Sequence, residues 1–121
     1  MKHKKTGRQL SRTRNQRRAL MKTMLGSLVL HERMTTTEAK AKEIKNNIDQ
    51  VVNKAKTART DETKKVAAIR DLRKDIPKVA LEKLIGDFGS RFDGRTSGYV
   101  RIIKLEARKS DSARMAIIEF V

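Results

Sequence analysis

The first quarter of the chain is the feature that most limits how it can fold. Residues 1 to 31 include no acidic residue, yet they carry nine Lys or Arg side chains. Like charges at this density repel one another and oppose compact folding in isolation. The segment therefore needs an oppositely charged partner, and phosphates would both neutralise and order it.

The rest of the chain is basic as well, although less so. Residues 32 to 121 contain 21 basic and 14 acidic side chains, and the whole 121-residue chain has a formal net charge of +16 at pH 7. Such a field attracts polyanions, of which nucleic acid is the commonest and an anionic membrane surface the alternative. With 37% hydrophobic and 3% aromatic residues, one domain with a small aliphatic core is expected.

Several functional classes are excluded or disfavoured by the residues themselves. The chain has no cysteine, which excludes disulfides, thiolate zinc sites and cysteine nucleophiles. No apolar run approaches the roughly 18 residues of a membrane-spanning helix. Asp87 and Asp93 have no histidine nearby, and no glycine-rich phosphate motif precedes a Lys-Ser or Lys-Thr pair. We therefore expect no enzyme activity, metal, cofactor, membrane or small-molecule substrate.

The N-terminal residues predict an arm followed by a helix with two different halves. Residues 1–10 lack apolar periodicity, which predicts an extended basic arm that can reach about 33 Å. Ser11 is the expected N-cap of a helix to about His31. Its apolar residues, at helical spacing, occupy only the second half, so this half should dock on the core while the first half projects. The apolar positions are Met21, Met24, Leu25 and Leu28.

Three more helices are expected in the middle of the chain. Thr37 is the predicted N-cap of an amphipathic helix to about residue 57. Thr60-Asp61-Glu62 is expected to start a third helix that runs to about residue 74. Pro77 suits the first turn of a fourth helix, which should stop at Gly86.

The remaining segments predict strands and one glycine-rich loop. The β-branched residues in 32–37 favour a strand. Residues 87–98 contain three glycines and are expected to form a loop, whereas 99–107 and 114–121 predict a β-hairpin. The expected order is helix, strand, three helices and two strands.

Basic residues near the N-terminus form the first candidate binding surface, because Lys and Arg neutralise phosphates and release counterions. Arg can also bind phosphate with two parallel hydrogen bonds. The alternative is a solvated tail and helix face, which the absence of neighbouring acids disfavours. The candidate residues are Lys2, His3, Lys4, Lys5, Arg8, Arg12, Arg14, Arg17, Arg18 and Lys22.

A second candidate patch lies in and after the glycine-rich loop. It consists of Arg91, Arg95, Tyr99 and Arg101, and the loop glycines would let RNA approach the backbone closely. Tyr99 is compatible with two roles: it could stack on a base or bond a sugar, or it could be a half-buried core residue.

Other functions remain as alternatives at this point. The acid-free segment also has the composition of a mitochondrial presequence. A nucleoid-type DNA-binding protein, an enzyme that acts on RNA, and a membrane-binding amphipathic helix over residues 11–31 are the further candidates. A nucleoid-type protein would usually be a dimer, and the sequence shows no strongly apolar surface that a dimer interface would bury.

Five short segments carry a recognisable pattern. They are Met1-Lys2-His3-Lys4-Lys5-Thr6-Gly7-Arg8-Gln9-Leu10-Ser11-Arg12, Gly26-Ser27-Leu28-Val29, Thr36-Thr37 with Lys40-Ala41-Lys42-Glu43, Gly98-Tyr99-Val100-Arg101-Ile102-Ile103-Lys104, and Met115-Ala116-Ile117-Ile118-Glu119. In the same order along the chain, these segments resemble the bacterial large-subunit ribosomal protein family numbered seventeen. Together they span almost the whole sequence, whereas residues 58–74 match this family least.

The resemblance implies a fold, a role and a set of partners. The fold would be a two-layer α+β domain over residues 11–121, with a small three-stranded sheet covered by helices and a basic N-terminal arm. The role would be a non-catalytic, structural one in the large ribosomal subunit, in the cytoplasm and near the nascent-chain exit region. Its partners would be large-subunit ribosomal RNA, bound mainly by shape and charge, and neighbouring ribosomal proteins, with no homo-oligomer.

Overall fold

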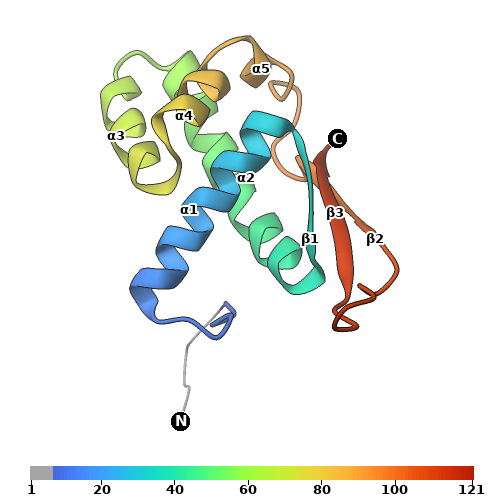
Figure 1. Ribbon diagram of the computed structural model, residues 1–121. Helices are drawn as coiled ribbons and strands as arrows, with labels where there is room; N and C mark the ends of the chain where they lie inside the picture. Colours follow the sequence, from blue (N-terminus) through green and yellow to red (C-terminus); the bar gives the residue numbers. More distant parts are fainter. Residues whose placement is uncertain (1–6) are drawn as a thin grey trace.

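The computed structural model describes residues 7–121, which form five helices and three strands (Figure 1). The predicted order is confirmed, with one addition: a four-residue helix lies inside the segment expected to be only a loop. The elements are α1 (Arg14–His31), β1 (Arg33–Thr37), α2 (Glu38–Thr60), α3 (Lys65–Asp75), α4 (Lys78–Ile85), α5 (Asp87–Ser90), β2 (Val100–Lys104) and β3 (Met115–Phe120).

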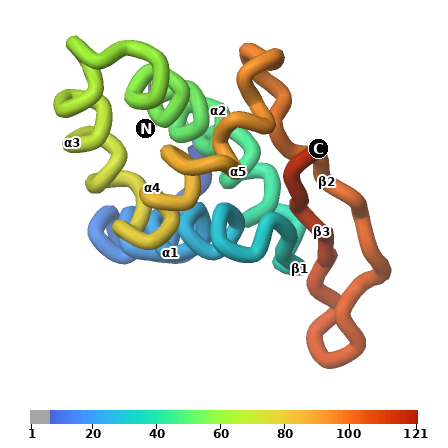
Figure 2. Tube along the Cα trace, turned by 90° about the horizontal axis from the view of Figure 1, so that it is seen from above, coloured from blue at the N-terminus to red at the C-terminus, as the bar shows by residue number. Residues whose placement is uncertain are grey.

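The three strands form one antiparallel sheet in the order β1-β3-β2. In its register, Ile117 of β3 lies between Thr35 of β1 and Ile103 of β2. Helix α2 packs against all three strands, and the helices lie to one side of the sheet in Figure 2. The predicted two-layer α+β architecture, with helices over a small sheet, is therefore confirmed.

The core lies between α1, α2, α4 and the inner face of the sheet. Leu28 of α1, Ile44 and Ile48 of α2, Leu84 of α4 and Ile118 of β3 are fully buried. Most of the core is aliphatic, as the composition predicted. The chain's four aromatic residues are gathered in one cluster of edge-to-face and tilted contacts at the end of the sheet near α5.

The start of α1 differs from the prediction. Ser11 is not the N-cap, because its φ of 55° is left-handed, whereas an N-cap residue is extended. Thr13 is the N-cap. Its hydroxyl accepts from the Gln16 amide at 3.4 Å, and the Gln16 side chain accepts from the Thr13 amide at 3.1 Å. This reciprocal pair is a capping box, whose Thr-x-x-Gln pattern is present in the sequence.

Helix α3 also begins later than predicted. Asp61 Oδ1 accepts hydrogen bonds from the Thr63 amide at 3.0 Å and the Thr63 hydroxyl at 2.6 Å. These bonds stabilise a turn that competes with helix formation. They also hold the pKa of Asp61 below its usual value. As a result, α2 continues to Thr60 and α3 starts at Lys65.

Candidate RNA interface

Helix α1 has the two halves that its sequence predicted. Its buried residues begin at Met24, while most of the residues in its first half are exposed. Arg14, Arg18 and Lys22 are all exposed and four residues apart, which places them in one row along the helix. Within residues 7–121, none of the three forms an ion pair with a carboxylate. Like charges in such a row repel one another, so an anion bound along it is favoured.

Two other arginines of this segment are partly buried and bond to the backbone. Arg12 Nη1 donates to the Leu10 carbonyl at 2.7 Å, and Arg17 Nη1 donates to the Arg12 carbonyl at 3.0 Å. These bonds hold the turn that leads into α1. Arg12 and Arg17 therefore have a structural role that the sequence did not indicate. They are less available to a bound anion than the exposed Arg14, Arg18 and Lys22.

Arg8 links the residues before α1 to helix α2. Its Nη1 lies 3.4 Å from Glu43 Oε2, and its backbone amide donates to the same oxygen. This contact places the end of the predicted arm beside α2. The predicted binding residues Lys2, His3, Lys4 and Lys5 lie outside the described residues.

A groove of about 450 Å³ lies between the first half of α1, the middle of α2 and the end of α3. Seven of its lining side chains are basic and two are acidic. Both acids are paired within the groove: Glu43 with Arg8, and Asp75 with Lys54 at 3.0 Å. Its residues are Gly7, Arg8, Leu10, Arg14, Arg17, Arg18, Met21, Lys22, Leu25, Glu43, Asn47, Gln50, Val51, Lys54, Lys74 and Asp75.

Sequence reasoning missed the side of this groove that α2 and α3 form. Gln50, Lys54 and Lys74 follow Arg18 by 32 or more residues in the chain, so no local motif connects them with Arg14 or Arg18. They meet because α1 and α2 cross in the fold and α3 packs on α2 (Figure 1). Only the tertiary arrangement carries this information.

The second predicted patch does not join the first. Arg91, Arg95 and Arg101 lie after α5 and on β2, at the opposite end of the molecule from the start of α1 in Figure 2. All three bond within the chain. Arg91 Nη2 donates to the Val121 carbonyl at 2.8 Å, Arg95 Nη1 donates to the Gly98 carbonyl at 3.3 Å, and Arg101 Nε lies 2.8 Å from Glu119 Oε1.

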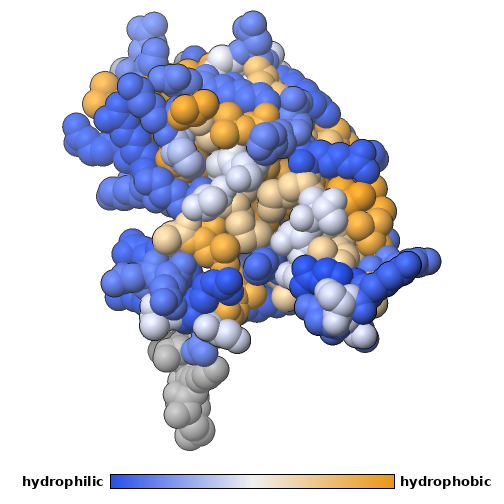
Figure 3. Space-filling model, viewed as in Figure 1, coloured by the Kyte–Doolittle hydropathy of each residue, from blue (hydrophilic) through white to orange (hydrophobic). Residues whose placement is uncertain are grey.

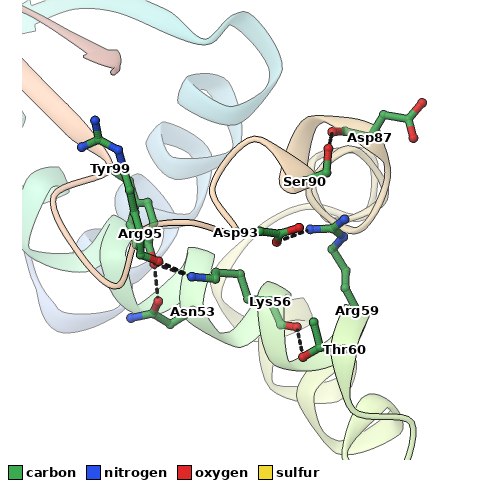
Figure 4. A network of polar contacts seen from close by, with 9 residues as sticks. All are labelled: Asn53, Lys56, Arg59, Thr60, Asp87, Ser90, Asp93, Arg95 and Tyr99. Atoms are coloured by element: carbon green, nitrogen blue, oxygen red, sulfur yellow. Dashed lines mark hydrogen bonds and ion pairs between the residues drawn. The ribbon is translucent and has the colours of Figure 1, made fainter.

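Tyr99 is a core residue, which decides between its two possible roles. Its side chain is fully buried, and its ring packs edge-on against Phe92. Its hydroxyl lies 2.6 Å from Asn53 Oδ1 and 2.9 Å from the Arg95 carbonyl oxygen, which also accepts from Lys56 (Figure 4). The prediction that Tyr99 stacks on a base is therefore wrong, because no face of the ring is accessible.

Across residues 7–121, no three carboxylate or imidazole side chains come together as ligands for a metal ion. No helix in that same range is long and apolar enough to cross a membrane.

Comparison with known proteins identifies the family. The family model described as "Ribosomal protein L17" matches residues 20–121. The chain belongs to the ribosomal protein L17 family. The resemblance drawn from the five sequence segments is thus confirmed, and so is the expectation of a structural protein without catalytic activity.

Three curated relatives match this chain over 73% to 97% of their own length. A protein of Anaeromyxobacter sp. (strain K) is 42% identical over all of this chain and 73% of its own length. One from Sorangium cellulosum (strain So ce56) is 38% identical over all of this chain and 83% of its own. One from Enterococcus faecalis (strain ATCC 700802 / V583) is 38% identical over 94% of this chain and 97% of its own. All three are described as "Large ribosomal subunit protein bL17".

Proposed function

We propose that this protein binds folded large-subunit ribosomal RNA through its N-terminal arm, residues 1–10, and the projecting first half of α1. Membership of the L17 family makes it a structural component of the large ribosomal subunit. Its partners there are ribosomal RNA and neighbouring ribosomal proteins, and its place is near the nascent-chain exit region.

The row formed by Arg14, Arg18 and Lys22 is the observation that supports this proposal best. These cations are exposed on one line of a helix, and within residues 7–121 no carboxylate pairs with them. Other arginines of the chain are paired with carboxylates, whereas these three cations remain available to external phosphates. The groove beside them adds Lys54 and Lys74 to the same positive region.

The proposed binding uses shape and charge more than base reading. An A-form RNA helix exposes its phosphates and 2′-hydroxyls, and a rigid helix that carries a row of cations can follow that backbone. The second patch contributes less in this proposal, because Arg91 and Arg101 are already paired with Glu32 and Glu119.

Salt-dependent binding of the purified protein to transcribed large-subunit ribosomal RNA tests the proposal. With six to ten phosphate contacts, the affinity should fall roughly 10³- to 10⁵-fold between 50 and 200 mM salt. Arg14→Ala/Arg18→Ala should weaken binding and make the slope of log K against log salt shallower by about 2. Small-subunit ribosomal RNA and duplex DNA should bind more weakly at every salt concentration.

A charge-matched double variant provides the control. Lys104→Ala/Lys109→Ala removes two exposed cations at the sheet end of the molecule and should leave the slope unchanged. Equal losses in the two double variants would show that only the total charge matters, and this outcome would contradict an interface on α1. Equal affinity for duplex DNA would favour the nucleoid alternative.

A further inference from the structure

The groove between α1, α2 and the end of α3 combines a positive rim with an apolar floor. The arginines and lysines of α1, α2 and α3 form the rim, whereas Leu10, Met21, Leu25 and Val51 form the floor. Leu25 and Val51 are buried, and the half-buried Leu10 and Met21 supply the accessible apolar surface. Figure 3 shows a hollow with hydrophobic atoms between the hydrophilic surfaces of α3 and of the first half of α1.

The charges of the groove determine what kind of ligand it suits. Its seven basic and two acidic side chains leave a net positive charge of five, since each acid is neutralised by a cation inside the groove. An anion is therefore favoured at the rim. A simple phosphate would leave the apolar floor in contact with water. The floor therefore favours a ligand in which an uncharged, flat or apolar group is attached to the anion.

Two amide side chains on α2 add hydrogen-bonding capacity. Asn47 Nδ2 donates to the Glu43 carbonyl at 3.1 Å, and its Oδ1 accepts no hydrogen bond within residues 7–121. Gln50, one turn further along, is exposed and makes no side-chain hydrogen bond within this range. These amide groups lie beside the apolar floor, where they could form hydrogen bonds with the edge of a nucleobase.

We propose that this groove seats one unpaired nucleotide of RNA, with its base on the floor at Met21 and its flanking phosphates on the basic rim. A nucleotide within an RNA strand combines an apolar face, a hydrogen-bonding edge and anionic groups on both sides. The flexible thioether of Met21 suits contact with an aromatic face. A volume of about 450 Å³ is in the usual range for a single small ligand and cannot hold a duplex. This inference rests on the proposed RNA-binding function and adds that one base is removed from its stack.

Two RNA hairpins closed by the same structured tetraloop test the proposal, one with a single bulged uridine in its stem and one with a fully paired stem. At 200 mM KCl, the wild-type protein should bind the bulged hairpin about tenfold more tightly, as expected for one base that gains a packing surface. Met21→Ala removes the side chain on which the base packs without changing the charge of the groove, and should bring the two affinities within about twofold of each other. Leu30→Ala, at an exposed position of the same helix, should keep the tenfold preference.

Cross-linking of the unaltered protein makes the test independent of how Met21→Ala folds. A 4-thiouridine at the bulge should cross-link to the tryptic peptides of residues 19–22 or 46–54, which contain Met21 and Gln50. Cross-links confined to residues 91–101 would overturn the proposal. Competition gives a second test, in which a hexaglutamate peptide and a single-stranded hexanucleotide each compete with the bulged RNA. If the peptide displaces the RNA at the same concentration as the hexanucleotide does, the proposal is overturned, because the groove would then recognise charge alone.

The outcomes separate this inference from the proposed function. If both hairpins bind equally and Arg14→Ala/Arg18→Ala weakens both, RNA binding stands and the nucleotide seat is wrong. If the protein binds neither hairpin and also fails to bind large-subunit ribosomal RNA, both proposals fail.

Discussion

The hydroxyl of Tyr99 lies 2.6 Å from Oδ1 of Asn53, and this contact fastens the loop after α5 to helix α2. Asp49, one turn earlier on α2, accepts from the amides of Gly98 at 3.2 Å and Tyr99 at 3.4 Å. Arg59 adds a 2.9 Å ion pair with Asp93 of the same loop (Figure 4). Helix α2 therefore fixes the point at which β2 enters the sheet.

Tyr99→Phe should destabilise the fold and leave RNA binding intact. The substitution keeps the buried ring and removes one hydroxyl, so we expect a loss of about 1 kcal/mol in the free energy of unfolding, measured by urea denaturation. Asn53 is exposed and can bond to water instead, which keeps the loss modest. A variant that folds with wild-type stability but loses RNA affinity would show instead that the hydroxyl bonds RNA.

The case of Tyr99 shows why part of the site could not be predicted from sequence. A tyrosine between glycines and arginines has the same local pattern whether it faces RNA or the core. The deciding partner, Asn53, is 46 residues away. Periodicity, in contrast, is local, so the docking half of α1 and the order of elements were predicted correctly. The predicted N-cap at Ser11 is wrong, although the sequence contains the capping-box spacing of Thr13 and Gln16.

The two leucines near the end of α1 should respond very differently to truncation. Leu28 is fully buried in the core, whereas Leu30 is 38% exposed. Leu28→Ala should reduce the free energy of unfolding by about 2–5 kcal/mol, because it removes buried methyl groups and leaves a cavity. Leu30→Ala should change it by no more than about 0.5 kcal/mol, as measured by the same urea titration. Similar losses in both variants would contradict the docking of this half of α1.

Two glycines near the end of α5 should also differ. A methyl group on Gly89 would overlap the Leu84 carbonyl oxygen, which is backbone and cannot rotate away, whereas one on Gly94 would meet no atom within 4 Å. Gly89→Ala should therefore destabilise the protein by about 1–3 kcal/mol. Gly94→Ala should be neutral or stabilising by up to about 1 kcal/mol, because it restricts the unfolded chain. Thermal unfolding of the two variants side by side measures the contrast.

The pH dependence of stability should include a contribution from Glu38. Its carboxylate accepts a hydrogen bond from Lys42 at 2.9 Å and lies 3.8 Å from Lys104 Nζ, and the Lys42 hydrogen bond is the main reason why its pKa falls below 4.5. A carboxyl group whose pKa is lowered in the folded state stabilises the fold above the unfolded pKa and loses this effect as pH falls through the folded pKa. The wild-type protein should thus be more stable than Glu38→Gln at pH 7, and the difference should vanish at a pH below the folded pKa.

Thermal unfolding from pH 7 to pH 2.5 measures this difference in stability. Glu62→Gln is the control, because Glu62 forms no ion pair within residues 7–121. A difference between wild type and Glu38→Gln that persists at the acid limit would show that the carboxylate charge is not its source.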